Sequence, residues 1–257
     1  MPTVRIIARL DIKGPRVVKG IRFEGLRVVG DPNELAMNYY GQGADEIICI
    51  DTVASLYGRN SLKEIVGRAV REVFIPITVG GGIRSVDDAR ELLRIGADKI
   101  AVNTAAVNRP ELITELAMAF GSQCVVVSIQ AKRRSHGWEA YTDYGREHTG
   151  LDALEWAKRA EELGAGEILL SSVDMDGTGQ GYDIELIRSV VEKAGIPVIA
   201  SGGMGTPGHC LEAIRSKADA VAVASSIHHG KNGVNDIRAF LMNAGVSVRQ
   251  WGQRSLS

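Results

Sequence analysis

The chain has 257 residues, of which 45% are hydrophobic and 24% are charged, with a formal net charge of -1 and a pI near 6.5. This composition is ordinary for a folded globular protein, and it excludes the strongly basic surface that nucleic acids or anionic membranes require. No apolar run approaches the roughly 18 residues of a membrane span, and the segment 1–10 lacks the apolar core of a secretion signal. We therefore expect a cytoplasmic protein with neither nucleic-acid nor membrane partners.

Short β-branched runs alternate with amphipathic segments from one end of the chain to the other, which is typical of repeated βα units around a parallel sheet. Most of the runs are continuously apolar, as expected for strands that are buried on both faces. The predicted strands are Arg5–Leu10, Glu46–Ile50, Pro76–Val79, Lys99–Val102, Cys124–Ile129, Glu167–Leu170, Pro197–Ala200 and Ala220–Ala224. Helical spacing of apolar residues marks Asp87–Ile95, Pro110–Phe120, Leu151–Leu163 and Asp183–Ala194.

This pattern predicts an α/β fold in which a single (β/α)8 barrel spans residues 1–245, followed by a frayed tail at 246–257. An internal repeat supports the barrel. Gly81-Gly82 recurs as Gly202-Gly203, and Asn103-Thr104 is matched by Ala224-Ser225, both 121 residues later, as in a duplicated half-barrel. A doubly wound open sheet would place G-x-G-x-x-G after the first strand, where this chain has Asp11-Ile12-Lys13-Gly14.

The repeated glycines and hydroxyls follow strands 3, 4, 7 and 8, and chemistry in such barrels gathers on these loops. Glycines let backbone N–H groups approach an anion closely. A single glycine pair is more typical of a tight turn, but its recurrence at one offset favours two phosphate pockets on opposite sides of the barrel mouth. Lys19 could add a cation from the first loop, although a lone loop lysine is usually solvated.

Cysteines and histidines give no sign of a metal or a disulfide. Cys49, Cys124 and Cys210 are widely spaced in apolar or helical stretches, which predicts reduced thiols in the core. The adjacent pair His228-His229 would point in different directions and has no third ligand at a suitable spacing, so we expect both to lie on the surface. No cofactor is expected.

Six segments, in this order, resemble the cyclase subunit of imidazole glycerol phosphate synthase. They are Val17–Gly20, Thr78–Ser85, Asn103–Val107, Gly121–Cys124, Gly166–Leu170 and Asp176–Thr178. The resemblance covers nearly the whole chain and implies an enzyme of histidine biosynthesis. Such an enzyme uses ammonia from a glutaminase subunit to convert a bis-phosphate aminoimidazole ribulotide into imidazole glycerol phosphate and AICAR.

The resemblance also implies a set of site residues. Gly82, Asn103 and Thr104 would hold one phosphate, and the other would lie on the opposite side of the mouth. Gly177, Gly203, Ala224 and Ser225 would hold that second phosphate. Lys19 and Asp176 complete the predicted substrate- and phosphate-binding residues.

Ammonia would enter at the opposite end of the barrel through a charged ring of Arg5, Glu46, Lys99 and Glu167. The alternative is a salt-bridged ring that only stabilises the barrel floor. Asp98 matches a position at the interface with the glutaminase, expected as a 1:1 heterodimer, although aspartate is common in such loops.

Two positions depart from the family pattern. The family uses two carboxylates as general acid and base; Asp11 matches the first, but Gln130 stands at the second, and a carboxamide cannot exchange a proton near neutral pH. Arg9 replaces a cysteine. By strand alternation it shares the barrel-facing side with Asp11, so we expect Arg9 to pair with Asp11 or another inward carboxylate and lower the pKa of that acid.

The segment 133–149, after strand 5, carries Trp138 and Tyr141 in alternation as well as Tyr144 and two histidines. These aromatic residues could stack on a substrate ring or pack a small β-hairpin over the barrel, and the alternation favours the hairpin. The role of His148 stays open.

Three functions fit these observations. The first is the family reaction, with Gln130 tolerated. The second is a paralogue that delivers ammonia to another acceptor, such as a nucleotide sugar for surface polysaccharide, and the loss of one acid favours it. The third is a catalytically silent barrel that activates a glutaminase.

Overall fold

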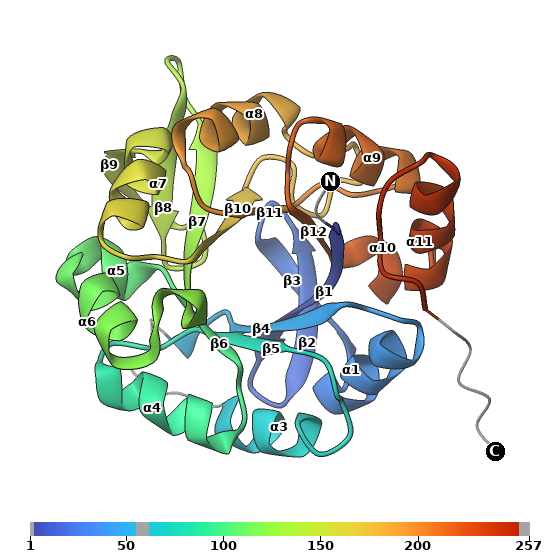
Figure 1. The fold of residues 1–257 in the computed structure, drawn as a ribbon, viewed down its shortest axis with the longest axis horizontal. Helices are drawn as coiled ribbons and strands as arrows, with labels where there is room; N and C mark the ends of the chain where they lie inside the picture. The colour runs from blue at the N-terminus through green and yellow to red at the C-terminus, as the bar shows by residue number, and fades with distance from the viewer. Residues whose placement is uncertain (1–2, 55–61, 252–257) are drawn as a thin grey trace.

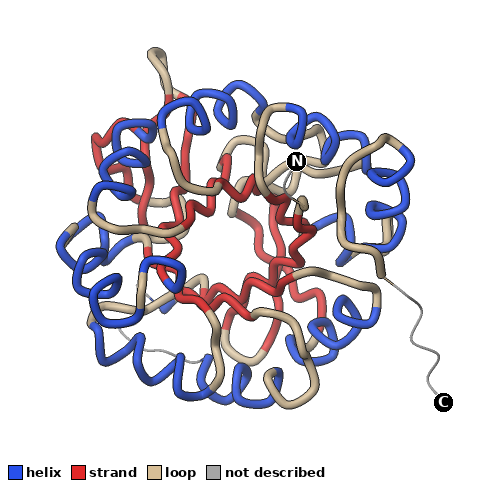
Figure 2. The backbone as a smooth tube through the Cα atoms, in the orientation of Figure 1, coloured by secondary structure: helices blue, strands red, loops and turns tan. Residues whose placement is uncertain are grey.

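A computed structural model describes residues 3–54 and 62–251. Eight parallel strands close into a ring that is surrounded by helices, as Figures 1 and 2 show. The strands are β1 (Arg5–Lys13), β4 (Glu46–Asp51), β5 (Ile77–Gly80), β6 (Lys99–Val102), β7 (Val125–Arg133), β10 (Glu167–Ser172), β11 (Val198–Ser201) and β12 (Ala220–Val223). Pairings of β1 with β12 and of β7 with β10 close the ring. The predicted (β/α)8 barrel is confirmed.

Helices form the outer layer of the barrel (Figure 1). The longer ones are α1 (Pro32–Gly41), α3 (Leu62–Ala69), α4 (Val86–Ile95), α6 (Glu111–Phe120), α7 (Ala153–Glu162), α8 (Ile184–Lys193), α9 (Pro207–Arg215) and α11 (Val234–Asn243). Short helical turns are α5 (Thr104–Asn108), η1 (Ser122–Cys124) and α10 (Ser225–His228). Side-chain caps fix several starts: Ser85 and Asp88 form a capping box at α4, and Asp152 and Asp183 cap α7 and α8.

Strand alternation divides the buried residues into two cores. Residues that face outward pack under the helices, whereas a smaller cluster fills the inside of the ring. That inner cluster comprises Ile7, Ile48, Ile50, Ala101, Val126, Leu169, Ile199, Ala220 and Ala222. The middle of the barrel is therefore mainly apolar, with the buried Thr78 as a polar residue beside Ile48.

Two β-hairpins extend the barrel at the carboxyl ends of β1 and β7. The first consists of β2 (Arg16–Ile21) and β3 (Glu24–Gly30), in a segment where the sequence predicted only a long loop. The second consists of β8 (Trp138–Thr142) and β9 (Glu147–Asp152), as predicted. The hairpins meet where the Phe23 ring stacks on the Tyr144 ring, with centroids 4.3 Å apart.

The C-terminal segment differs from the expected frayed tail as far as Trp251. Val248 is buried and forms a parallel bridge with Val4. The Arg249 side chain pairs with Asp45 at 2.9 Å, and the Trp251 ring packs edge-on against Tyr40. Side-chain packing on the barrel floor therefore orders this segment.

The three thiols are free. Cys49 and Cys210 are buried as predicted, whereas Cys124 is only half-buried. Within the described ranges, no helix combines the length and the apolar character that crossing a bilayer demands.

Candidate functional site

The mouth of the barrel holds a buried ion pair between Arg9 and Asp11, which both point inward from β1. Arg9 Nε donates to Asp11 Oδ1 at 2.9 Å, and Lys19 Nζ donates to Asp11 Oδ2 at 3.1 Å. Burial alone would raise the pKa of Asp11, but the charges of Arg9 and Lys19 outweigh it and hold the pKa at about 2. The predicted pairing is confirmed, and so is the predicted lowering of the pKa of the carboxylate that Arg9 pairs with. Asp11 is therefore an anion at neutral pH.

The guanidinium of Arg9 is held from three sides. Besides Asp11, it donates from Nη1 to Ser171 Oγ at 2.7 Å and to Ser201 Oγ at 3.0 Å. Its central carbon lies 5.6 Å from the Phe23 ring centroid, in a cation–π arrangement. A charge this deeply buried needs such partners, and β1, β10, β11 and the first hairpin supply them.

Lys19 lies on β2 and is only 4% exposed, so it is not a solvated loop lysine. Its ammonium contacts both Asp176 oxygens, at 2.7 and 2.9 Å, in addition to Asp11. Two cations and two carboxylates therefore balance one another at this side of the mouth.

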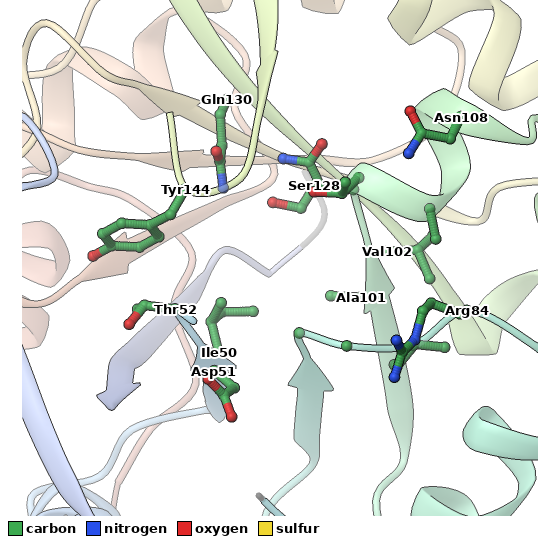
Figure 3. A pocket seen from close by; sticks show the side chains of 16 residues that line it. Ile50, Asp51, Thr52, Arg84, Ala101, Val102, Asn108, Ser128, Gln130 and Tyr144 are labelled. Atoms are coloured by element: carbon green, nitrogen blue, oxygen red, sulfur yellow. The ribbon is translucent and has the colours of Figure 1, made fainter. Parts of the chain in front are cut away.

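Gln130, near the end of β7, lies beside a cavity of about 200 Å³ that is open to the mouth (Figure 3). Its side chain is buried, and Oε1 has no hydrogen-bond partner among the described residues. Tyr144, Ser128, Asn103 and Thr104 line the same cavity. The position where the resemblance implies a second carboxylate thus presents a neutral, unsatisfied acceptor to the cavity.

The two predicted phosphate pockets share one backbone design. Asn103 precedes α5 with φ −134° and ψ −88°, and Ala224 precedes α10 with φ −140° and ψ −83°. Gly82 and Gly203, in the preceding loops, both have positive φ, 74° and 106°. The sequence repeat is therefore a repeat of conformation, as the duplicated half-barrel predicts.

The first pocket is part of the large cavity, which Gly82, Asn103 and Thr104 line. The second is smaller, about 10 Å³. It is lined by Lys19, Asp176, Gly177, Ser201, Gly202, Gly203, Met204, Ala222, Ala224 and Ser225.

Two glycines of the second pocket have no room for a side chain. A Cβ on Gly203 would lie 1.9 Å from the Gly181 carbonyl oxygen, and one on Gly177 would lie 2.2 Å from that of Gly20. Backbone packs directly on backbone there, which keeps the amide groups near the pocket.

At the opposite end of the barrel, four charged side chains form a closed ring. Arg5 pairs with Glu46 at 2.7 Å and with Glu167, and Lys99 pairs with the same two carboxylates at 3.2 and 2.9 Å. The four residues are those of the charged ring that the resemblance implied, and the ion pairs fit both a conduit and a ring that only stabilises the floor. A depression of about 360 Å³ that Arg5, Lys99 and Glu167 help to line opens beside the ring.

Asp98 lies on the same face and is exposed, but its carboxylate also accepts a hydrogen bond from the Ile77 N–H at 2.8 Å. It therefore caps the start of a strand whatever else it contacts.

The histidines depart in part from expectation. The prediction that His228 lies on the surface is wrong: the Tyr39 hydroxyl lies 2.7 Å from its Nδ1, and burial lowers its pKa to about 4. His229 is exposed, as predicted. His148 is exposed beside Glu139 and does not line the cavity. In the described part of the chain, no cluster of three or more His, Cys, Asp or Glu side chains could hold a metal ion.

Sequence reasoning missed Tyr144 as a cavity residue. Its hydroxyl is buried near the Asp11 carboxylate but makes no well-formed hydrogen bond to any described residue. Burial, with the charge of Asp11, raises the pKa of Tyr144 well above the ordinary value. Tyr144 and its neighbour Asp143 have φ of 59° and 49°, at the tip of the second hairpin. The alternation of aromatic residues predicted the hairpin but not the direction of this ring.

Fold and site together define a (β/α)8 barrel with a polar, two-pocket mouth and a charged floor. The family described as "Histidine biosynthesis protein" matches residues 5–232. The chain belongs to this family, as the resemblance implied.

Proteins similar to this chain include imidazole glycerol phosphate synthase HisF subunits. The protein of that name from Legionella pneumophila is 65% identical over 206 residues, which cover 80% of this chain and 97% of the relative. Those from Pyrococcus furiosus and Methanopyrus kandleri are 54% and 52% identical, over 95% and 96% of this chain and 98% of each relative.

Proposed function

We propose that this chain is the synthase subunit of an imidazole glycerol phosphate synthase and uses ammonia to close the imidazole ring of a bis-phosphate aminoimidazole ribulotide. The observation that carries the proposal is the pair of like-built pockets on opposite sides of one mouth. A substrate with a phosphate at each end would span them, with its reacting centre over the polar residues between. The names of the relatives support the same reaction.

In this proposal, Gly82, Asn103 and Thr104 bind one phosphate, and Gly177, Gly203, Ala224 and Ser225 bind the other. Backbone amides and hydroxyls are suitable donors to phosphate oxygens.

Asp11 would act as a fixed anion. With a pKa of about 2 it carries no proton to donate at neutral pH, but it can stabilise positive charge that develops when ammonia adds to a carbonyl carbon. Lys19 would keep Asp11 and Asp176 oriented through its bonds to both.

The floor ring supports a second part of the proposal, in which a glutaminase subunit docks on this face as a 1:1 partner in the cytoplasm. Ammonia would pass the ring of Arg5, Glu46, Lys99 and Glu167 and travel through the apolar interior to the mouth. Asp98, exposed on the same face, would contact the partner.

One observation favours a second candidate function. Gln130 cannot transfer a proton, and Arg9 lowers the pKa of Asp11 so that Asp11 stays ionised. The mouth is therefore poor in groups that exchange protons near neutral pH. The same barrel could then deliver ammonia to a different acceptor that needs less proton transfer. A silent barrel that activates a glutaminase would need only the floor and one filled pocket.

An assay with purified chain and ammonium salt separates these functions, because it needs no partner. The main proposal expects ammonium-dependent consumption of the ribulotide and formation of imidazole glycerol phosphate, followed by chromatography. A wild type that binds the ribulotide without turning it over would contradict the main proposal in favour of another acceptor. Turnover by Gln130→Asp would then identify the missing carboxylate as the cause.

A further inference from the structure

Two buried polar atoms at the cavity beside Gln130 are left unsatisfied by the residues that the structure describes. Gln130 Oε1 and the Tyr144 hydroxyl each lack a well-formed hydrogen bond to the described residues, and both side chains are only 5% exposed. They do not bond to each other. Buried polar groups are nearly always paired, so two unpaired ones that line one cavity indicate that a ligand completes them.

The scaffold fixes both side chains in place. Gln130 is held in β7, whose backbone pairs with β10 on one side and β8 on the other. The Tyr144 ring is stacked on Phe23, and its neighbour Asp143 is bonded to Thr104 through the backbone N–H at 3.2 Å. Figure 3 shows the two side chains on one side of the cavity, across from Arg84 and Asn108.

The chemistry of the two groups restricts the ligand. Gln130 Oε1 can only accept, so it calls for an N–H or O–H on the ligand. The hydroxyl of Tyr144 stays protonated near neutral pH and can donate to a ligand oxygen or nitrogen. The complementary group is neutral and carries a donor beside an acceptor, as in a hydroxyketone or an amide.

We propose that Tyr144 and Gln130 together bind the centre of the acceptor molecule, between its two phosphates, through a neutral donor–acceptor pair. This inference rests on the proposed function, because it takes the bis-phosphate ribulotide as that acceptor. Tyr144 is thereby assigned as a specificity residue of the mouth, and Gln130 as a binding group rather than a defective acid.

Binding of the ribulotide, measured by titration calorimetry without ammonia, tests the inference. Tyr144→Phe removes only the hydroxyl and keeps the stack on Phe23, and Gln130→Met keeps the side-chain length. Each should raise the Kd for the ribulotide about tenfold, the ~1.4 kcal/mol of one hydrogen bond. The Kd for inorganic phosphate should not change, because the phosphate pockets are intact.

Tyr141→Phe is the matched control for the loss of a hydroxyl. Tyr141 lies on the same hairpin, but its hydroxyl bonds to Arg134 and does not line the cavity. Its ribulotide Kd should equal that of the wild type.

The melting temperature shows whether the Tyr144 hydroxyl bonds to a ligand or to the Asp11 carboxylate. The nearby carboxylate of Asp11 is the rival acceptor, and a hydroxyl that bonds to it would stabilise the fold without ligand. The melting temperature of ligand-free Tyr144→Phe should equal that of the wild type, because a hydroxyl that bonds only to the ligand adds no hydrogen bond to the ligand-free fold. A lower melting temperature together with unchanged ribulotide binding would assign the hydroxyl to Asp11 and overturn the inference.

Ribulotide binding by Tyr144→Phe at wild-type strength would overturn the inference while leaving the proposed function intact. Equal losses of ribulotide and phosphate binding would also overturn it, since they indicate a structural role for the hydroxyl. A wild-type chain that binds phosphate but not the ribulotide would overturn the proposed acceptor and this inference together.

Discussion

Arg9 and Asp11, two residues apart on one strand, form an ion pair of 2.9 Å in which the arginine is 2% exposed and the aspartate is fully buried. The pair converts a carboxylate at the centre of the mouth into a permanent anion. It also places a second cation beside Lys19, whose ammonium lies 3.1 Å from the same carboxylate. The charge state of Asp11 therefore depends on Arg9 and Lys19.

Arg9→Met should destabilise the protein. The substitution leaves Asp11 buried with Lys19 as its remaining cation, and breaking a buried pair costs about 3 kcal/mol in the free energy of unfolding. Urea unfolding at pH 7 measures the loss. Arg68→Met, which removes an exposed pair with Glu64, is the control and should cost less than about 1 kcal/mol.

The stability of the same variant should depend less on pH in acid. A carboxylate with a folded pKa of about 2 stabilises the native state above its ordinary pKa of 3.8, and that stabilisation is lost as the pH falls toward 2. Without Arg9 the pKa of Asp11 rises toward its ordinary value, so the free energy of unfolding should fall less between pH 3.8 and pH 2 than it does in the wild type. Equal losses in the two proteins over this range would contradict the assignment of Arg9 as the main partner.

His228 should make stability depend on pH in a different window. Its folded pKa is about 4, against 6.5 ordinarily, because burial disfavours the charged ring. The unfolded chain takes up a proton between these values and the folded chain does not, so stability should fall by up to about 3 kcal/mol as pH drops from 6.5 to 4.

Thermal unfolding of His228→Asn across this range checks the effect, and the variant should show a flatter profile than the wild type. His229→Asn changes the exposed neighbour and should keep the wild-type slope. A His228→Asn profile that is as steep as that of the wild type would assign the dependence to another group.

The two phosphate pockets should lose affinity independently. Thr104→Val and Ser225→Ala each remove one hydroxyl at the start of α5 or α10, and each should weaken binding of the bis-phosphate ribulotide about three- to tenfold. Because the pockets lie on opposite sides, the double variant should show the product of the two effects. Ser189→Ala, at an exposed hydroxyl of α8, should bind as the wild type does.

Lys99→Met should affect turnover with glutamine and the partner subunit more than turnover with ammonium salt. Glu46 and Glu167 are both nearly buried and would share Arg5 alone, so the free energy of unfolding should fall by about 3 kcal/mol. Turnover with ammonium salt should persist, whereas glutamine-driven turnover with the partner should drop as ammonia escapes at the opened floor. Equal losses with both sources would contradict a conduit role. Lys193→Met, at an exposed pair with Glu155, is the control.

The sequence predicted the barrel because its signals are local and repeated. Each strand is a short apolar run with its own period, and the 121-residue offset relates Asn103 to Ala224 by sequence and by backbone angles. Alternation along one strand predicted that Arg9 faces inward and pairs with Asp11 or another inward carboxylate, and the partner is Asp11. The floor ring was implied by the family resemblance, and its four residues lie at strand starts.

Contacts between distant segments were not predictable in this way. Lys19 reaches Asp176 across 157 positions, and the long first loop that carries it proved to be a hairpin. The ring of Tyr144 meets Phe23 only because both hairpin tips turn through left-handed backbone conformations. The residues next to His228 in the sequence do not predict its contact with Tyr39, which lies on a distant helix.

A crystal of the chain grown with inorganic phosphate tests the two-pocket mouth most directly. We expect one phosphate on the loop of Gly82, Asn103 and Thr104, and a second on the loop of Gly203 and Ser225, on the other side of the mouth. Electron density for phosphate at neither loop, at concentrations that saturate binding in solution, would contradict the claim that two phosphate pockets define this site.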